Sequence, residues 1–160
     1  MEKFEKLFAE YPCSLTDELV KKNAADILAQ HKEENNTREV WMQCLNQIDL
    51  TTLNGEDTTA KVATMAQKVN DFDGHFPGIP NVAAMCVYPA LVETAKEVLT
   101  EPIGIAAVAG GFPASQTFIE VKVAEAAMAV AAGATEIDIV ISIGKFLEGN
   151  YQEVYDEISE

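Results

Sequence analysis

Short apolar runs alternate with helical patterns from residue 44 onward, and this alternation constrains the fold more than any other feature of the chain. The apolar runs cover residues 44–50, 82–87, 103–109 and 136–143. The helical patterns lie between them, at residues 58–69, 89–99 and 117–132. Strands that alternate with helices of 10–15 residues predict βαβ units and a parallel sheet. Because the runs are apolar throughout, we expect both faces of the sheet to be covered.

Four βα units fit two α/β architectures. They complete a small doubly wound sheet, or they form half of a (β/α)8 barrel, which needs about 250 residues. The final pattern at 151–160 places Val154, Tyr155 and Ile158 on one helical face, and it ends on acidic residues without a glycine cap. Helices prefer cations in their last turn. We therefore expect the sequence to stop inside a helix and to represent the first half of a larger fold.

Residues 1–43 differ in character and predict a helical N-terminal extension. Ser14 begins a pattern close to a capping box and is the expected N-cap of a helix. The apolar residues that follow recur at helical spacing and predict one stripe that packs on the main body: Leu19, Val20, Ala24, Ile27 and Leu28. The predicted domains are therefore residues 1–43 and residues 44–160.

Charge and cysteine content exclude several classes of protein. With 11 Lys and Arg against 26 Asp and Glu, the net charge is −15, which disfavours nucleic acids and anionic membranes. No apolar stretch reaches the roughly 18 residues that span a bilayer, and the first residues lack a secretory signal. The three cysteines form no CxxC pair, so we expect no disulfide framework, no metal site and a cytoplasmic location.

A carboxylate interrupts the fourth apolar run, at Asp138. An unpaired charge in an apolar interior costs several kcal/mol, so Asp138 either faces outward or has a partner and a task. Asp49 ends the first predicted strand, and ligands of parallel α/β proteins bind at the carboxyl ends of strands. The two carboxylates could share a proton or pair with one cation. Alternatively, each binds a backbone N–H or a structural lysine.

Five segments resemble the deoxyribose-phosphate aldolase family, in order and in approximate spacing. They are residues 49–53 (DLTTL), 82–89 (VAAMCVYP), 111–113 (GFP), 133–140 (GATEIDIV) and 149–151 (GNY). The resemblance covers about residues 44–160. It implies a (β/α)8 barrel of which this chain holds about the first four βα units, and a class I aldolase that needs no cofactor.

The resemblance also implies site residues and a reaction. The family cleaves 2-deoxy-D-ribose 5-phosphate to acetaldehyde and D-glyceraldehyde 3-phosphate through a lysine Schiff base. Asp138 and Asp49 match its catalytic polar network, and Thr51, Leu53 and Cys86 match its substrate pocket. The Schiff-base lysine and its partner lie on the sixth and seventh strands of the family fold, which this chain does not reach. Lys145 matches neither, so we expect the 160-residue chain to be inactive alone.

Two other readings remain open. A half-barrel exposes two strand edges and an apolar interior, which favours a non-catalytic module that self-associates, in the simplest case as a homodimer. A complete flavodoxin-like binding domain is less favoured, because no phosphate-binding loop follows the first strand. The expected small-molecule partners, a sugar phosphate and aldehydes, belong to the aldolase reading alone.

Overall fold

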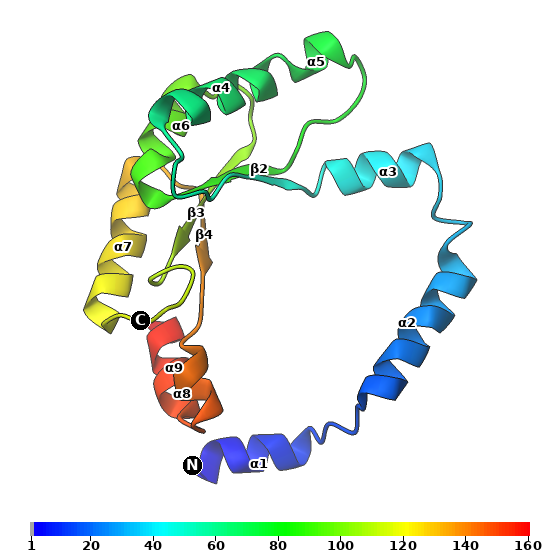
Figure 1. Ribbon diagram of the computed structural model, residues 1–160, viewed down its shortest axis with the longest axis vertical. Coiled ribbons are helices and arrows are strands. Elements are labelled where there is room, and N and C mark those ends of the chain that lie inside the picture. Colours follow the sequence, from blue (N-terminus) through cyan, green and yellow to red (C-terminus); the bar gives the residue numbers. More distant parts are fainter. Residues whose placement is uncertain (1) are drawn as a thin grey trace. The chain divides into compact units, whose positions relative to one another are not determined.

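The computed structural model describes residues 2–160, which divide into two compact units between Met42 and Gln43. The first unit is helical and holds α1 (Glu2–Glu10), α2 (Asp17–His31) and the start of α3 (Arg38–Leu45). The second unit holds the end of α3 and every strand of the described residues (Figure 1).

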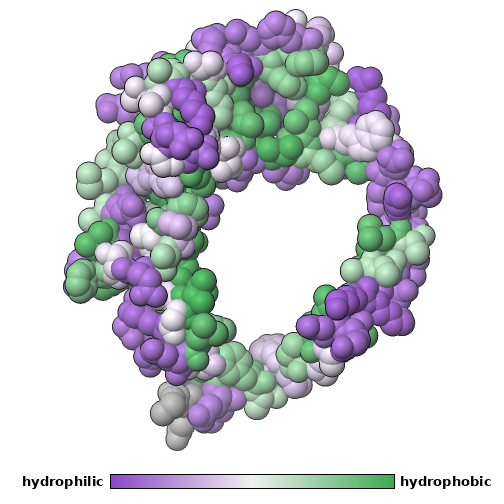
Figure 2. All heavy atoms as spheres, viewed as in Figure 1, coloured by the Kyte–Doolittle hydropathy of each residue, from purple (hydrophilic) through white to green (hydrophobic). Residues whose placement is uncertain are grey.

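The N-cap of α2 is Thr16, and the prediction of Ser14 is wrong. The Thr16 hydroxyl accepts a hydrogen bond from the Leu19 amide at 3.2 Å, which satisfies one of the free N–H groups of the first turn. The predicted apolar stripe stays exposed, because α2 buries no side chain. Hydrophobic residues are visible between hydrophilic ones along this helix in Figure 2, and Leu28 is 62% exposed.

The second unit alternates strands and helices, as predicted. Its strands are β1 (Asp49–Thr51), β2 (Ala84–Val87), β3 (Gly104–Ala109) and β4 (Glu136–Ile139). The segments between them are α4 (Thr59–Asn70), α5 (Phe72–His75), the 3-10 turn η1 (Pro89–Leu91), α6 (Val92–Val98) and α7 (Ile119–Ala132). Two helices follow β4, namely α8 (Ile143–Leu147) and α9 (Tyr151–Ser159).

The four strands form one parallel sheet in the order β1-β2-β3-β4. Each strand lies beside its predecessor, so successive right-handed crossovers advance in one direction and place their helices on one face. Figure 1 shows α4, α6 and α7 on that side of the strands. A flavodoxin-like sheet has β1 inside the sheet. Here β1 is an edge strand, and the flavodoxin-like reading is wrong.

The first and last strands differ most from the predicted runs. The run at 44–50 yields a strand only from Asp49, because α3 begins after Thr37, whose hydroxyl accepts from the Val40 amide at 3.3 Å, and continues through Leu45. The run at 136–143 ends its strand at Ile139. Asp49 therefore begins β1 instead of ending it.

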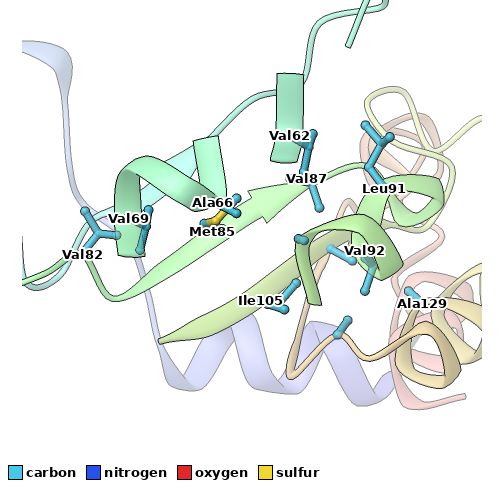
Figure 3. Packing of buried hydrophobic residues seen from close by; sticks show 13 residues of the cluster. Val62, Ala66, Val69, Val82, Met85, Val87, Leu91, Val92, Ile105 and Ala129 are labelled. Carbon is cyan, nitrogen blue, oxygen red and sulfur yellow. The ribbon is translucent and has the colours of Figure 1, made fainter. Parts of the chain in front are cut away.

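The main core fills the space between the sheet and its helices. Met85, Val87 and Ile105 point from β2 and β3 toward α4, α6 and α7 (Figure 3). Gly133 ends α7 with φ of +116°, and a Cβ there would lie 2.3 Å from the Lys96 side chain. This core accounts for only one face of the strands.

Candidate active site

The opposite face of the sheet carries every site residue that the sequence predicted on a strand. Register pairs Thr51 with Cys86, Cys86 with Ala106, and Ala106 with Glu136. Side chains alternate between faces along a strand, so Asp49 and Asp138 share this face. We call it the open face, and its strand residues are Asp49, Thr51, Ala84, Cys86, Gly104, Ala106, Val108, Glu136 and Asp138.

Asp138 is exposed on the open face, opposite Val108 in the register with β3. Its neighbours along β4, Ile137 and Ile139, point to the helix-covered side, where Ile137 packs on the main core. The charge in the fourth apolar run is thus accommodated by alternation: the carboxylate faces away from the core that its neighbours help to build.

Asp49 lies at the other corner of the open face. It pairs with Ala84 at the amino end of β1, whereas Asp138 lies toward the carboxyl end of β4. Three strand spacings of about 4.8 Å separate the two strands. No hydrogen bond joins the two carboxylates in the described part of the chain, so the idea of a shared proton is wrong for this arrangement.

Thr51, Leu53 and Cys86 lie close to one another at β1 and β2. Cys86 is 3% exposed and packs with Ala106 and Val108, and Leu53 packs on this small cluster. The Thr51 hydroxyl donates to the Asp49 carbonyl at 2.8 Å.

The Cys86 thiol is held in its protonated form. Burial raises its pKa, the charge of Asp138 raises it further, and a hydrogen bond with Thr51 partly opposes both. The charges of Asp49 and Glu136 act in the same direction as that of Asp138. A protonated, buried thiol is a poor nucleophile, which fits the packing of Cys86 within this buried cluster.

Sequence reasoning missed three residues of this face. Tyr88 donates its hydroxyl to the Leu53 carbonyl at 3.2 Å, and its ring meets Phe112 edge-on, with centroids 6.2 Å apart. Both rings cover the Cys86 cluster at the carboxyl ends of the strands. Glu136 shares the face of Asp138, and its spacing of two residues from Asp138 is the signal that could have identified it.

The loop after β1 is organised around the carboxylate of Asp57. The Asp57 carboxylate accepts from the Thr52 hydroxyl at 2.9 Å and from the Asn54 amide at 3.0 Å, and it pairs with Lys61. The Lys61 ammonium is the main cause that lowers the pKa of Asp57 to about 2. These bonds fix residues 52–57, and with them Leu53, above β1.

No strand of the described sheet carries a lysine or arginine. Lys145 follows β4, but Glu153 and Glu157 bind its ammonium and raise its pKa. Lys122 is buried under α9, 2.6 Å from the Ser142 hydroxyl and 3.1 Å from Glu157. Paired ammonium groups are poor nucleophiles, so neither lysine can serve the open face.

The β3–α7 loop, the first residues of α7 and the helices α8 and α9 border a hollow of about 670 Å³. Ser115, Thr117 and Phe118 line it from the β3–α7 loop, and Gly144 and Lys145 line it from α8. Residues 2–160 contain no group of three or more His, Cys, Asp or Glu side chains that could hold a metal ion. No helix among them is long and apolar enough to cross a membrane.

Comparison with known proteins assigns the chain to a family. Residues 44–160 match the model of the DeoC/LacD family aldolases. The chain is 36% identical over 154 residues to the deoxyribose-phosphate aldolase of Homo sapiens, and equally similar to that of Bos taurus; both matches cover 88% of this chain and 48% of the relative.

Solved structures agree on the fold. QR15, an aldolase, is 27% identical with a TM-score of 0.62, and the match covers 71% of this chain and 47% of QR15. The tetrameric deoxyribose-phosphate aldolase from Aeropyrum pernix has a TM-score of 0.57 at 22% identity, covering 84% of this chain and 56% of that one. The chain spans about half the length of the relatives it matches. Its parallel sheet with alternating helices matches about half of these TIM-barrel aldolases, and the chain belongs to the DeoC/LacD family of aldolases.

Proposed function

We propose that these residues form the first four βα units of a deoxyribose-phosphate aldolase. The complete enzyme cleaves 2-deoxy-D-ribose 5-phosphate to acetaldehyde and D-glyceraldehyde 3-phosphate through a lysine Schiff base. Its lysine comes from strands outside these 160 residues, so this chain alone is inactive. The proposed location is the cytoplasm.

Asp138 has the central role in this proposal. A lysine nucleophile must be neutral at working pH, which desolvation and a neighbouring cation achieve. Once the amine has added to the carbonyl, the resulting carbinolamine must lose water, which requires proton transfer. Asp138 relays these protons and stabilises the charged network, while Asp49 belongs to the same network at the amino end of β1.

The pocket residues determine what lies beside the reacting carbon. Leu53, which packs over the buried Cys86, Ala106 and Val108, offers an apolar surface on the face of Asp138. Thr51 adds a hydroxyl on the same face. Such a surface suits a two-carbon aldehyde fragment, while the polar hollow between residues 115–118 and α8 suits the hydroxylated part of the sugar.

One observation carries the proposal: Asp138 lies on an open face that holds three carboxylates and no amine on its four strands. A face of this charge needs amines from elsewhere once a barrel closes over it. The match to the DeoC/LacD aldolase family supports an aldolase activity, and a Schiff-base mechanism of this activity requires such amines.

The test compares this chain with the product of the complete gene that contains it. Each is incubated with acetaldehyde and borohydride, which reduces a Schiff base to a stable adduct, and is analysed by mass spectrometry. We expect an adduct only on the complete protein, together with cleavage of 2-deoxy-D-ribose 5-phosphate. An adduct on the 160-residue chain would refute its inactivity, and a complete protein without cleavage would refute the proposed substrate.

The role of Asp138 is tested in the same complete protein. We expect Asp138→Asn to lower kcat by about 10²- to 10⁴-fold, the usual contribution of a general acid–base group. Asp156→Asn is the matched control, because it makes the same change at an exposed position of α9. Equal activity of the two variants would remove Asp138 from the mechanism.

A second candidate function is a non-catalytic module that self-associates. It is favoured by the edge strand β4, where Ile139 is 46% exposed, and by the nearby Ile141, 40% exposed. Unpaired strand edges with apolar side chains pair readily with another chain.

A further inference from the structure

Glu136 occupies a place on the open face that neither the sequence motifs nor the proposed mechanism uses. It begins β4 and stands opposite Ala106, on the same face as Cys86 and Asp138. Within residues 2–160 its carboxylate has neither a hydrogen-bond partner nor an ion-pair partner. An acid that points away from the core and binds nothing around it is available to act on a group that approaches this face.

The neighbouring strand is shaped to receive this side chain. A Cβ on Gly104 of β3 would lie 2.3 Å from Glu136 Oε1 and 3.1 Å from the Ala84 Cβ. The carboxylate therefore lies in a hollow that exists only because residue 104 has no side chain. Gly104 is not among the residues with positive φ, so its backbone conformation does not require glycine. The room for Glu136 is the reason that the structure offers for a glycine in the middle of the sheet.

Among the strands of the described sheet, no positively charged side chain shares the open face with Glu136. Asp138 follows it on β4, Asp49 lies on β1, and the thiol of Cys86 lies on β2. On the open face β3 contributes only Gly104, Ala106 and Val108, none of which is charged. Three carboxylates enclosed together in a barrel would repel one another unless cations neutralise them.

We propose that Glu136, seated over Gly104, is a positioning residue of the aldolase, and that its fixed negative charge holds an ammonium group brought by the second half of the barrel. This inference rests on the proposed function. Glu136 does not transfer protons to the substrate. It acts through the Schiff-base lysine and the partner lysine of that residue. Its charge favours the protonated form of the amine that faces it, and so raises the pKa of that amine.

The test is the pH dependence of kcat/KM in the complete protein. Activity rises with pH as the nucleophilic amine loses its proton. Glu136→Gln removes the charge that stabilises the protonated amine, so the acidic limb should move to lower pH by about one unit, the size of effect of an opposite charge within about 6 Å. Glu97→Gln, which makes the same change at an exposed position of α6, should leave the limb in place.

Gly104 provides an independent arm of the test. Gly104→Ala pushes the carboxylate out of its hollow and should shift the limb in the same direction as Glu136→Gln. Glu136→Asp shortens the side chain, so it no longer reaches over residue 104. In that background Gly104→Ala should add no further shift, because coupled changes are not additive. If the Gly104 variants do not fold, the Gln and Asp variants at position 136 decide the question.

The outcomes separate the two proposals. A wild-type protein without aldolase activity overturns the proposed function, and this inference with it. An active wild type in which Glu136→Gln lowers kcat/KM equally at all pH values gives Glu136 a structural role only and overturns this inference alone. An equal shift in Glu97→Gln would also overturn it, because the effect would then be one of net charge.

Discussion

At the scale of single residues, Cys86 is a reporter of the electrostatics of the open face. Its thiol is buried among uncharged side chains, while Asp138, Asp49 and Glu136 surround it on the same face. Burial raises the pKa of the thiol, and the charge of Asp138 raises it further. A titration of this one thiol therefore measures whether Asp138 faces where the structure puts it.

We predict that Asp138→Asn lowers the pKa of Cys86 but leaves it above the ordinary value of a thiol, because the contribution of burial remains. The measurement is the pH dependence of the Cys86 ¹³Cβ shift in a Cys13→Ser/Cys44→Ser background, which removes two exposed thiols. Asp156→Asn should leave the titration unchanged. An unchanged pKa in Asp138→Asn would show that this carboxylate does not face Cys86.

A candidate site residue can be predicted from the sequence where its side chain differs in polarity from its neighbours. Asp138 stood out because a charge interrupts an apolar run. Glu136 did not, because it stands at the end of its run, where an acid is unremarkable. Its significance depends on Gly104, 32 residues earlier, and only strand register brings the two together. The sequence singles out Asp49 as a candidate but places it at the carboxyl end of its strand, whereas the helix α3 shortens that strand from the amino side and leaves Asp49 at its start.

At the scale of elements, α9 is attached by a buried cluster of charges. The side chains of Lys122 on α7 and Glu157 on α9 are 8% and 10% exposed. The Ser142 hydroxyl donates to Glu157 at 2.7 Å, and Lys145 donates to it at 2.6 Å. Burial alone would raise the pKa of Glu157, but the hydrogen bonds from Lys145, Ser142 and Lys122 outweigh it and lower the pKa to about 2.

Glu157→Gln should therefore lower the free energy of unfolding by about 3 kcal/mol, because it leaves the Lys122 ammonium buried without its counter-charge. Urea denaturation followed by circular dichroism at pH 7 measures this loss. Glu153→Gln removes a partner of Lys145 that is 52% exposed, and should cost far less. Similar losses in both variants would contradict a buried anchor.

The same carboxylate makes stability depend on pH in a defined direction. Its pKa is about 2 in the folded state against 4.5 ordinarily, so its stabilisation is complete above about pH 4.5 and is lost as the pH falls toward 2. Glu157→Gln should flatten this part of the curve. Some acid dependence should remain, because the pKa of Asp57 is also lowered, from 3.8 to about 2.

Periodicity predicted the existence of the elements better than their ends. The runs at 82–87 and 103–109 form β2 from Ala84 and β3 from Gly104, and both strands continue to the end of their runs. Both are buried strands that lie between other strands. The runs at 44–50 and 136–143 belong to the edge strands, and helices α3 and α8 take part of each. A backbone with only one strand neighbour gains fewer hydrogen bonds by staying extended, so local helical capping decides the boundary there.

At the scale of the whole molecule, the sequence predicts the parallel sheet but does not predict which partners pair with its two edge strands. Alternating βα units predicted a parallel sheet, and the parallel pairing of β1 with β2, β2 with β3 and β3 with β4 confirms it. What pairs with the free edges of β1 and β4 cannot be derived from periodicity, because within residues 2–160 each of these strands has one strand neighbour. An apolar groove of about 500 Å³ beside β4, lined by Val130, Ile139 and Ile158, continues this incomplete surface.

We predict that the 160-residue chain self-associates through β4 as its concentration rises. Ile139→Lys places a charge on the edge strand, the device by which proteins prevent edge pairing, and should return the chain to a monomer in sedimentation velocity experiments, with circular dichroism confirming the fold. Leu28→Lys is the matched control, since Leu28 is an equally apolar and more exposed side chain, on α2. If Leu28→Lys abolishes association while Ile139→Lys does not, the helical unit is the interface. If the wild-type chain stays monomeric at every concentration, the exposed edge of β4 does not pair with a second copy of the chain, and this prediction is wrong.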